Sequence, residues 1–359
     1  MKFASIAAAS LLLASGFSVV TSASAQGPAP AAASAGEINL YSARHYATDE
    51  ALYANFTKAT GIKVNRLDAD DAGLVARLKS EGASSPADVI LLVDAARMYR
   101  LEADGMFQPI RSKVLEDAIP ATLRSKPAAD GGTQWFGFST RARIVVYDKT
   151  RVNVADVDTY EELGDPKNKG RICIRSASHP YNLSLFSAIN EHLGDEKTEA
   201  FLKGLAGNLA RAPKGGDTDQ IKGVASGECQ VAITNSYYLA RLMRSDKPED
   251  KAVAEKVSFV FPNQASWGTH VNIAGGGVAR YAKNRDNAVR FLEYLATPEA
   301  QTYFANGNNE YPTAKGVKID NPALQSMSPN GFKLETVHVT AVGMNQTKVQ
   351  QMLDRVGFK

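Results

Sequence analysis

Four of the 13 tyrosines in this sequence are predicted to lie where a strand ends and a helix begins. These four are Tyr46, Tyr181 and the adjacent pair Tyr237 and Tyr238. In open α/β sheets, ligands bind at the edge formed by the carboxyl ends of the strands. Because the four tyrosines come from both halves of the chain, we expect their phenols to converge on one binding site.

Convergent phenols favour a hard and highly charged cation as the ligand. A deprotonated phenol is a hard, anionic oxygen donor, which such cations prefer over sulfur. A free phenol has a pKa of about 10, but a bound cation stabilises the deprotonated form. Ferric iron is known to bind tyrosinate. Calcium and magnesium would require carboxylates and zinc would require clustered histidine or cysteine, and the sequence has neither an EF-hand loop nor a CxxC pair.

Two arginines are candidates for balancing the charge of such a site. Four phenolates around a trivalent cation leave one negative charge. Arg241 follows Tyr237 by four residues and Tyr238 by three, so on a helix the three side chains share one surface. Its guanidinium could hydrogen-bond a phenolate and hold it in place. Arg141 is the second candidate.

Other interpretations of the same residues stay open. A tyrosine pair taken alone is more often core or surface filler than a ligand. His45, beside Tyr46, could be a fifth ligand, and His179 raises the same question near Tyr181. A single histidine in a loop is a bystander at least as often as a ligand.

The elements that must position these residues follow an α/β pattern. In the first half, predicted strands alternate with helices, which indicates a mostly parallel sheet. Residues 135–148 form a long extended run that we interpret as a crossing between two lobes. The second half repeats the alternation, and residues 287–305 are predicted to form one amphipathic helix. We expect two α/β lobes with a cleft between them.

The first residues of the chain predict export. Lys2 precedes the apolar run "IAAASLLLASGFSVV", and Ala23 and Ala25 form a cleavage site, so residues 1–25 are predicted to be a secretory signal peptide. A membrane anchor is the weaker alternative, because the run is short and interrupted by serines and a glycine. Residues 26–36 are predicted to be a flexible leader. We therefore expect an exported protein with a periplasmic location.

The two cysteines, Cys173 and Cys229, are predicted to form a disulfide, since the predicted compartment is oxidising and two cysteines allow one pairing. A metal–thiolate site is the weaker alternative, because neither cysteine belongs to a CxxC pair.

Composition limits the class of protein. The 359 residues include 41 Lys and Arg against 38 Asp and Glu, and removing the signal peptide leaves a net charge of about +2. This balance gives no support for binding to nucleic acid or to a membrane surface. The five histidines are scattered, and no nucleophile–base set can be assembled from them, so we expect no enzyme activity. Roughly 330 mature residues favour two domains.

Six segments together resemble a known family. They are "NLYSARHY", "SPADV", "RAR", "SHPYNLSL", "TNSYYLARL" and "NNEYPT". In this order they resemble the periplasmic ferric-iron-binding proteins of ABC transporters, over nearly the whole mature chain. The match is closest to the branch that supplies a histidine–tyrosine pair and three further tyrosines.

The resemblance implies a type II periplasmic-binding-protein fold that closes on iron. It implies an N-terminal lobe of residues 37–138 and 265–312 and a C-terminal lobe of residues 139–264 and 313–359. It implies an iron site whose ligands are Tyr46, Tyr181, Tyr237 and Tyr238, with His45 less certain, and with Arg141 and Arg241 behind the phenolates. Other members supply a glutamate after the "PADV" strand, but this sequence has only Asp94 there, which we do not count as a ligand.

The resemblance also implies how the protein works. The cargo is Fe³⁺, in some relatives with a synergistic anion such as carbonate or phosphate. The partner is an ABC transporter permease with a separate ATPase subunit, because this chain has no nucleotide-binding motif. We expect a monomer that does not insert into the membrane. The alternative is a solute-binding protein of the same fold for a small organic or anionic ligand, such as thiamine, a phosphonate or a polyamine.

Overall fold

The computed structural model describes residues 35–44, 46 and 48–359, and residues 35–359 form one compact unit. The predicted signal peptide, most of the predicted leader and His45 lie outside the described residues. Within the described part, no helix is long and apolar enough to span a bilayer.

One mixed sheet with the order β2-β1-β3-β8-β4-β6-β5 organises the described residues, and β7 and β9 pair with β4 beside this path. The strands are β1 (Glu37–Ser42), β2 (Lys63–Asp68), β3 (Val89–Val93), β4 (Phe136–Asp148), β5 (Ile172–Cys173), β6 (Val231–Asn235), β7 (Val257–Val260), β8 (Val271–Val278) and β9 (Tyr311–Pro312). The predicted parallel pairing holds for β2-β1-β3 and for β5-β6. The prediction of a mostly parallel first half is only partly right, because β8 pairs antiparallel with both β3 and β4.

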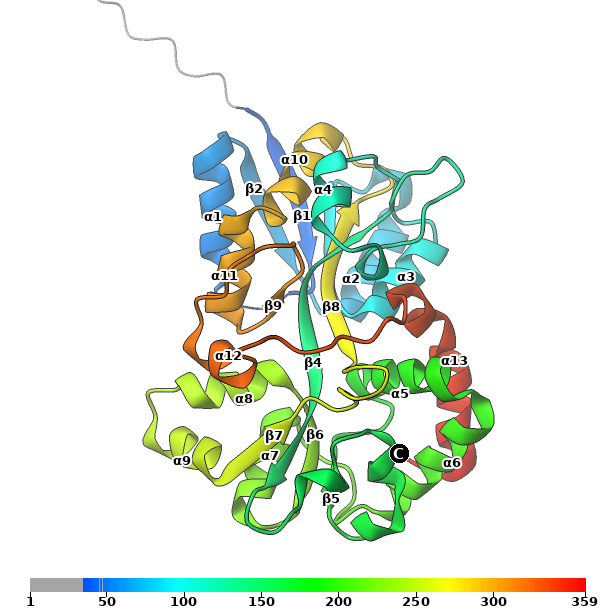
Figure 1. Cartoon of the computed structure of the whole chain (residues 1–359). Helices are drawn as coiled ribbons and strands as arrows, with labels where there is room; N and C mark the ends of the chain where they lie inside the picture. The colour runs from blue at the N-terminus through cyan, green and yellow to red at the C-terminus, as the bar shows by residue number, and fades with distance from the viewer. Residues whose placement is uncertain (1–34, 45, 47) are drawn as a thin grey trace, which may run out of the picture. The chain divides into compact units, whose positions relative to one another are not determined.

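The long strand β4 joins the two halves of the sheet (Figure 1). Its first part, from Phe136 to Ala142, pairs with β8, and its second part, from Arg143 to Tyr147, pairs with β6. The strand therefore changes partner between Ala142 and Arg143. This agrees with the crossing predicted for residues 135–148, and it places Arg141 at the change of partner.

Helices cover both halves of the sheet. They are α1 (Asp49–Thr60), α2 (Asp71–Glu81), α3 (Ala95–Ala103), α4 (Lys113–Ala118), α5 (Pro180–Leu193), α6 (Asp195–Gly207), α7 (Asp217–Ser226), α8 (Ser236–Arg244), α9 (Pro248–Lys256), α10 (Arg285–Leu295), α11 (Pro298–Asn308), α12 (Pro322–Met327) and α13 (Val339–Val356). In Figure 1, α1, α10 and α11 lie with the first half, and α5 to α9 lie with the second.

The single helix predicted over residues 287–305 is wrong. The chain forms two helices there, because α10 ends at Leu295 and α11 begins at Pro298. Proline has no N–H to continue the helix and fits best in a first turn. Thr297 completes the break by accepting the Ala300 N–H with its side chain.

The buried residues form two clusters. The first includes the fully buried strand β3 together with Phe56, Trp135 and Phe291. The first cluster also reaches into the second half of the sheet, where it includes Cys173 and Ala232, and the second cluster includes Phe186 of α5 and Leu353 near the end of α13. Apolar packing therefore supports the strands of both halves.

A segment from residue 331 to residue 338, which we call the C-terminal crossover, passes in front of β4 in Figure 1. It is tied to the chain just before β8: Thr269 N–H donates to Lys333 O at 2.8 Å, and Glu335 N–H donates to Thr269 O at 3.0 Å. The crossover then leads into α13. It is thus a third stretch of chain that lies beside β4 and β8, the two strands that run between the halves of the sheet.

Cys173 and Cys229 form a disulfide, which is the pairing predicted from the sequence. The bond joins β5 to the turn that precedes β6, and these two strands are also paired by backbone hydrogen bonds.

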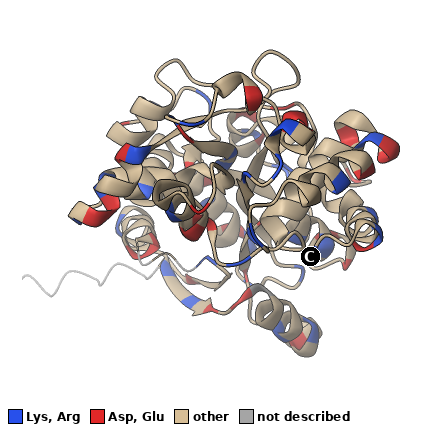
Figure 2. Ribbon diagram, turned by 90° about the horizontal axis from the view of Figure 1, so that it is seen from below, with Lys and Arg blue, Asp and Glu red and all other residues tan. Residues whose placement is uncertain are grey.

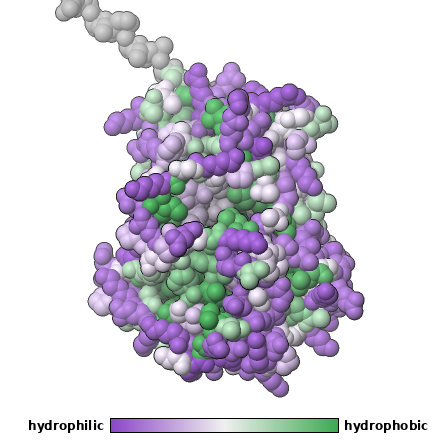
Figure 3. Space-filling model, viewed as in Figure 1, coloured by the Kyte–Doolittle hydropathy of each residue, from purple (hydrophilic) through white to green (hydrophobic). Residues whose placement is uncertain are grey.

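The surface carries charges of both signs. Figure 2 shows Lys and Arg interspersed with Asp and Glu over the elements seen from below. Figure 3 shows hydrophilic residues over most of one face, with hydrophobic residues gathered around a hollow near its middle. A pocket of about 460 Å³ in the described residues is lined by apolar side chains of β9, α12 and the crossover, among them Tyr311, Leu324 and Phe332.

Candidate metal centre

The structure places each predicted tyrosine at the end of a strand or in the first turn of a helix. Tyr46 lies in the loop between β1 and α1, and Tyr181 is the second residue of α5. Tyr237 and Tyr238 are the second and third residues of α8, directly after β6. Each of these segments joins a strand to the start of a helix, and in α5 the His179 side chain caps the first turn.

The four phenols meet in one place. The hydroxyl oxygens of Tyr181 and Tyr237 are 3.4 Å apart. The rings of Tyr237 and Tyr238 are stacked, with their centroids 4.2 Å apart. Tyr46 lies within electrostatic reach of both Tyr181 and Tyr237. The arrangement therefore brings together oxygen donors from three separate segments of the chain.

Burial keeps the phenols of Tyr46, Tyr237 and Tyr238 protonated unless a cation replaces the protons. Tyr237 is 3% exposed, and burial raises its pKa well above the ordinary value, with the neighbouring Tyr46, Tyr181 and Tyr238 adding to the effect. Burial is also the main cause that raises the pKa of Tyr46 and that of Tyr238. Only a strongly charged cation can displace protons from such groups at neutral pH.

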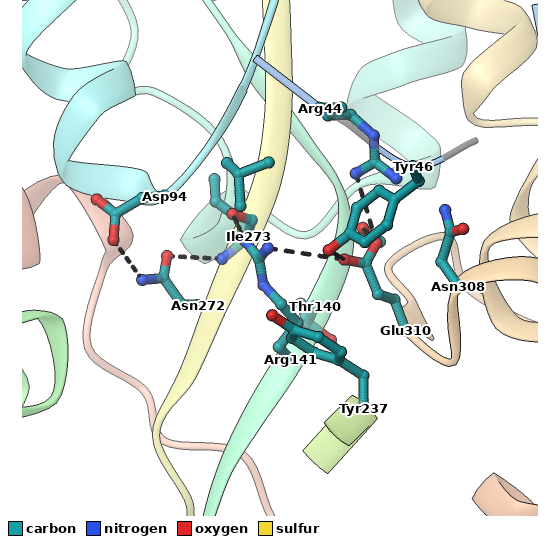
Figure 4. Close-up of polar contacts among 12 residues, drawn as sticks. Arg44, Tyr46, Asp94, Thr140, Arg141, Tyr237, Asn272, Ile273, Asn308 and Glu310 are labelled. Atoms are coloured by element: carbon teal, nitrogen blue, oxygen red, sulfur yellow. Dashed lines mark hydrogen bonds and ion pairs between the residues drawn. The ribbon is translucent and has the colours of Figure 1, made fainter. Parts of the chain in front are cut away.

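Arg141 lies beside the phenols in a fully buried position on β4, 1% exposed. One of its terminal nitrogens donates to Ile273 O, and the other lies 3.6 Å from Glu310 Oε1. Burial alone would lower the pKa of Arg141, but Glu310 and the phenols outweigh it and raise that pKa. Among the described residues, Nε and Nη1 of Arg141 have no hydrogen-bond partner. Two N–H groups of a buried cation are thus available next to the tyrosines (Figure 4).

Glu310 completes this side of the site, and the sequence analysis gave it no role. Its fully buried carboxylate accepts the Tyr46 hydroxyl at 3.1 Å and the Ser139 hydroxyl at 2.5 Å, and it lies 3.4 Å from Arg44 Nη1. Figure 4 shows it between Arg44 and Arg141. The signal was present in "NNEYPT", where a lone acidic residue precedes a Tyr-Pro pair.

Arg241 lies on the same surface as the tyrosine pair, as its spacing predicts. Its guanidinium carbon is 5.6 Å from the centre of the Tyr237 ring and 5.5 Å from that of Tyr238. The contact that the structure shows is with the ring faces, whereas the sequence predicted a hydrogen bond to a hydroxyl oxygen. A cation over an aromatic face still contributes favourable electrostatic energy.

Two further arginines hold Tyr181, and the sequence analysis assigned neither. Arg175 lies 5.0 Å and Arg143 lies 6.0 Å from the centre of the Tyr181 ring. Arg143 is fixed by Asp217 and by Asn182, each at 2.6 Å. Arg143 belongs to the quoted "RAR" segment, which is the one signal in the sequence that pointed to it.

His179 acts as the cap of α5. Its Nδ1 accepts the Tyr181 N–H at 3.2 Å, and its ring packs edge-on against the Tyr181 ring with the centroids 4.6 Å apart. Burial, together with Arg175, Arg143 and Arg97, lowers the pKa of His179 to about 3. The imidazole is therefore neutral at pH 7, and its position is explained by the helix cap.

Asp94 has both carboxylate oxygens engaged elsewhere. It caps α3 by accepting the Ala96 N–H at 2.8 Å, and it accepts the Asn272 side-chain amide at 2.7 Å. His45, the fifth candidate ligand, lies outside the described residues. The described residues contain no group of three or more His, Cys, Asp or Glu placed to hold a metal ion.

A surface pocket of about 590 Å³ lies beside the tyrosine pair. Its lining includes Arg241 and Arg244 from α8, Thr48 from the segment after Tyr46, and Asn309 next to Glu310. Arg244 Nη1 donates to Asn306 O at 2.6 Å and to Asn309 Oδ1 at 2.7 Å. The pocket thus opens where α8 faces the end of α11, at the edge of the site.

Comparison with known proteins places the chain in a family. Residues 51–328 match the family model described as bacterial extracellular solute-binding protein. This chain belongs to that family. It is 47% identical to iron uptake protein A1 of Synechocystis sp. over 323 residues, which cover 90% of this chain and 88% of the relative. It is 26% identical to the major ferric iron-binding protein of Neisseria meningitidis serogroup B over 329 residues, covering 90% and 93%.

A solved structure from Trichodesmium shows the same fold. That protein, FutA (IdiA) in complex with iron and citrate ligands, is 50% identical and superposes with a TM-score of 0.85, covering 90% of this chain and all of the relative's. These similarities confirm the two-lobed periplasmic-binding-protein fold and the resemblance to ferric-iron-binding proteins that the sequence motifs predicted.

Proposed function

We propose that this protein is an extracytoplasmic solute-binding protein that captures ferric iron and delivers it to the permease of an ABC transporter. The observation that carries the proposal is the convergence of four phenols beside the buried Arg141. Similarity to proteins named for iron uptake and for ferric iron binding supports the same cargo.

The charges around the site fit a trivalent cation. When Tyr46, Tyr181, Tyr237 and Tyr238 bind Fe³⁺ as phenolates, the cluster carries one negative charge. Arg141 offers such phenolates N–H groups that have no hydrogen-bond partner among the described residues, and Arg241 adds a second positive charge over the rings. A divalent cation would leave two negative charges and would compete less well with the phenol protons.

Two further groups could complete the coordination of the iron, and we propose both from the resemblance to ferric-iron-binding proteins. His45 stands next to Tyr46 in the sequence and is the candidate for a fifth ligand. An anion such as carbonate would fill a further position. The Trichodesmium relative, described with iron and citrate, supports a role for a small anion.

Capture and delivery would proceed by closure of the lobes. In the predicted division, Tyr46 belongs to the N-terminal lobe (residues 37–138 and 265–312), and the other three tyrosines belong to the C-terminal lobe. A cation that binds tyrosines of both lobes favours the closed form of the protein, because only in that form can all four phenols contact the cation. The permease would recognise this closed form, and the change of partner in β4 is the place where the chain can flex.

The same proposal assigns no catalytic step to the chain. A separate ATPase subunit would drive transport, and the protein would act as a periplasmic monomer after removal of its signal peptide. We propose no binding to nucleic acid and no insertion into a membrane.

A visible absorption titration of chelator-stripped protein with ferric citrate tests the proposal. We expect a broad phenolate-to-iron charge-transfer band that is complete at one equivalent of iron. The band should be lost or strongly weakened in Tyr237→Phe and in Tyr238→Phe. Tyr281→Phe is the matched control, because Tyr281 is 43% exposed and should leave the band unchanged.

A protein without the band would contradict the iron site. If thiamine, a phosphonate or a polyamine then raised the melting temperature, the fold would carry an organic or anionic ligand instead. A band that survives in both Tyr237→Phe and Tyr238→Phe would place the iron elsewhere.

A further inference from the structure

A continuous chain of polar side chains, all buried except the partly exposed His192, runs through the crossing region. We call it the buried relay, and its members in order are Asp94, Asn272, Ser184, His270, Glu335 and His192. The Asn272 amide nitrogen donates to Asp94 at 2.7 Å and to Ser184 Oγ at 2.8 Å. Ser184 Oγ lies 2.9 Å from His270 Nε2. His270 Nδ1 contacts Glu335 Oε1, and His192 Nε2 lies 3.2 Å from Glu335 Oε2.

The hydrogen bonds of the relay assign its protons. A carboxylate only accepts, so His270 Nδ1 donates to Glu335. Ser184 Oγ accepts the Asn272 amide and pairs with His270 Nε2. Asn272 uses both amide hydrogens, and its oxygen accepts the backbone N–H groups of Ala95 and Ile273 at 2.9 and 2.8 Å. The side-chain hydrogen-bonding groups of the central residues are thus paired.

The order Ser184–His270–Glu335 matches that of a hydrolytic triad, but the surroundings exclude that role. Ser184 is 0% exposed, and its hydroxyl is held by Asn272 on one side and by His270 on the other. A nucleophile needs a substrate within reach of its oxygen. We therefore infer that the relay holds the elements that it connects in position.

The relay connects elements from distant parts of the chain. Asp94 directly follows β3, Asn272 lies in β8, and His270 directly precedes β8. Glu335 comes from the C-terminal crossover, and Ser184 and His192 come from α5. Helix α5 is thereby fastened to the strand and the crossover that pass between the two halves of the sheet.

We propose that Ser184, through Asn272 and His270, is a positioning residue for Tyr181 in the metal site. Tyr181 lies one helical turn before Ser184 at the start of α5, so any shift of this turn moves the phenol. Asn182, in the same turn, is bonded to Arg143 of β4. The first turn of α5 is thus anchored to both crossing strands, which fixes where the Tyr181 oxygen can lie. This inference rests on the proposed function, since it takes Tyr181 as an iron ligand.

Ser184→Ala and Ser187→Ala form the matched pair that tests the role. Ser187 lies on the same helix and is equally buried, but its hydroxyl has no partner among the described residues. Loss of an outer partner of a metal ligand typically weakens binding by about 10–100-fold. We expect Ser184→Ala to speed the release of iron to a competing chelator by roughly 10-fold and to shift the charge-transfer band. Ser187→Ala should change neither.

A double-mutant cycle separates positioning from a general structural effect. In a Tyr181→Phe background, Ser184→Ala should have little further effect on iron release, because the phenol that it positions is gone. An equal effect in both backgrounds would overturn the inference while leaving the proposed function intact. A wild-type protein without a charge-transfer band would instead overturn the proposed function.

Glu335→Gln keeps the experiment informative if Ser184→Ala does not fold. Glutamine can still accept from His270 and donate to His192, so the relay keeps its shape but loses its negative charge. We expect a faster release of iron in the same direction, but smaller than in Ser184→Ala. Two results together would contradict a positioning role. Glu335→Gln would release iron at the wild-type rate with an unchanged spectrum, and the double-mutant cycle would show no coupling between Ser184 and Tyr181.

Discussion

The tyrosine site and the buried relay share helix α5 but treat their polar groups in opposite ways. In the tyrosine site, Arg141 keeps buried N–H groups without hydrogen-bond partners, and burial raises the phenol pKa values. In the relay, Asn272 and Ser184 make every hydrogen bond their positions allow. Unpaired buried polar groups are costly and therefore mark where a ligand completes the structure, whereas paired networks specify the fold.

The contrast predicts that a change in the tyrosine site acts mainly on iron binding, whereas a change in the relay acts mainly on stability and, through Tyr181, to a smaller extent on iron binding. Variants of the tyrosine site should lose iron but keep their stability. Variants of the relay should lose stability first and iron binding second.

The largest effect is expected for Tyr237→Phe. Four-ligand metal sites contribute about 10–16 kcal/mol of binding energy, so losing one ligand should cost about 3 kcal/mol, or roughly 100-fold in affinity. Its hydroxyl lies 3.4 Å from that of Tyr181, which is a long and weak hydrogen bond, so the free energy of unfolding without iron should change by less than about 1 kcal/mol. Competition with citrate and urea denaturation measure the two quantities. If the variant lost much stability but kept its affinity for iron, Tyr237 would serve the fold and not the metal site.

Asn272→Ala should show the opposite pattern. Removing the amide leaves the carboxylate of Asp94 and the backbone N–H groups of Ala95 and Ile273 short of partners, which costs about 2–4 kcal/mol of unfolding free energy. The exposed Asn330 offers the control, and Asn330→Ala should cost less than about 0.5 kcal/mol. Urea denaturation without iron checks both variants. Equal stability of the two would mean that the relay contributes nothing to the fold.

The affinity for iron should fall as the pH falls. Raised pKa values mean that Tyr46, Tyr237 and Tyr238 are protonated before iron binds, so each of these three must release a proton. Protons then compete with iron, by about tenfold per pH unit for each phenol. Tyr238→Phe removes one of these groups, so the slope of log affinity against pH should decrease by about one. Parallel citrate competition with wild type and variant measures this difference, and parallel slopes would show that Tyr238 does not bind as a phenolate.

The smallest effect concerns the pH dependence of stability in the relay. Burial acts to raise the pKa of Glu335, but His270 and His192 outweigh it and hold that pKa below its ordinary value. A depressed pKa in the folded state stabilises the protein above the unfolded value of about 4.3, and this contribution is lost as the pH falls through the lower folded value. Glu335→Gln should therefore unfold with a shallower pH dependence below about pH 5. Urea denaturation at several pH values tests this, and an unchanged slope would contradict a charged Glu335.

Local sequence patterns predicted the positions of the tyrosines well. A strand followed by a polar turn and a helix is a local signal, and it correctly placed Tyr46, Tyr181 and the Tyr237–Tyr238 pair at strand ends. The disulfide could be predicted because the chain has only two cysteines. The crossing in β4 was visible as an unusually long extended run.

The remaining parts of the site depend on contacts that no local pattern contains. Glu310 meets Tyr46 across 264 residues of sequence, and Ser184 meets His270 across 86. A lone acidic or serine residue has no periodicity that reveals its partner. The break between α10 and α11 was missed for a different reason, since an apolar stripe continued on both sides of Pro298 and outweighed the local effect of proline in the prediction.

The crystal structure of the protein loaded with ferric iron at neutral pH would test the central claim most directly. Anomalous scattering would locate the metal independently of any assumption about its ligands. The account predicts one iron bonded to the phenol oxygens of Tyr46, Tyr181, Tyr237 and Tyr238, with Arg141 donating to them and the relay unchanged. An iron bound to carboxylates at another place, with the four phenols free of it, would contradict the account.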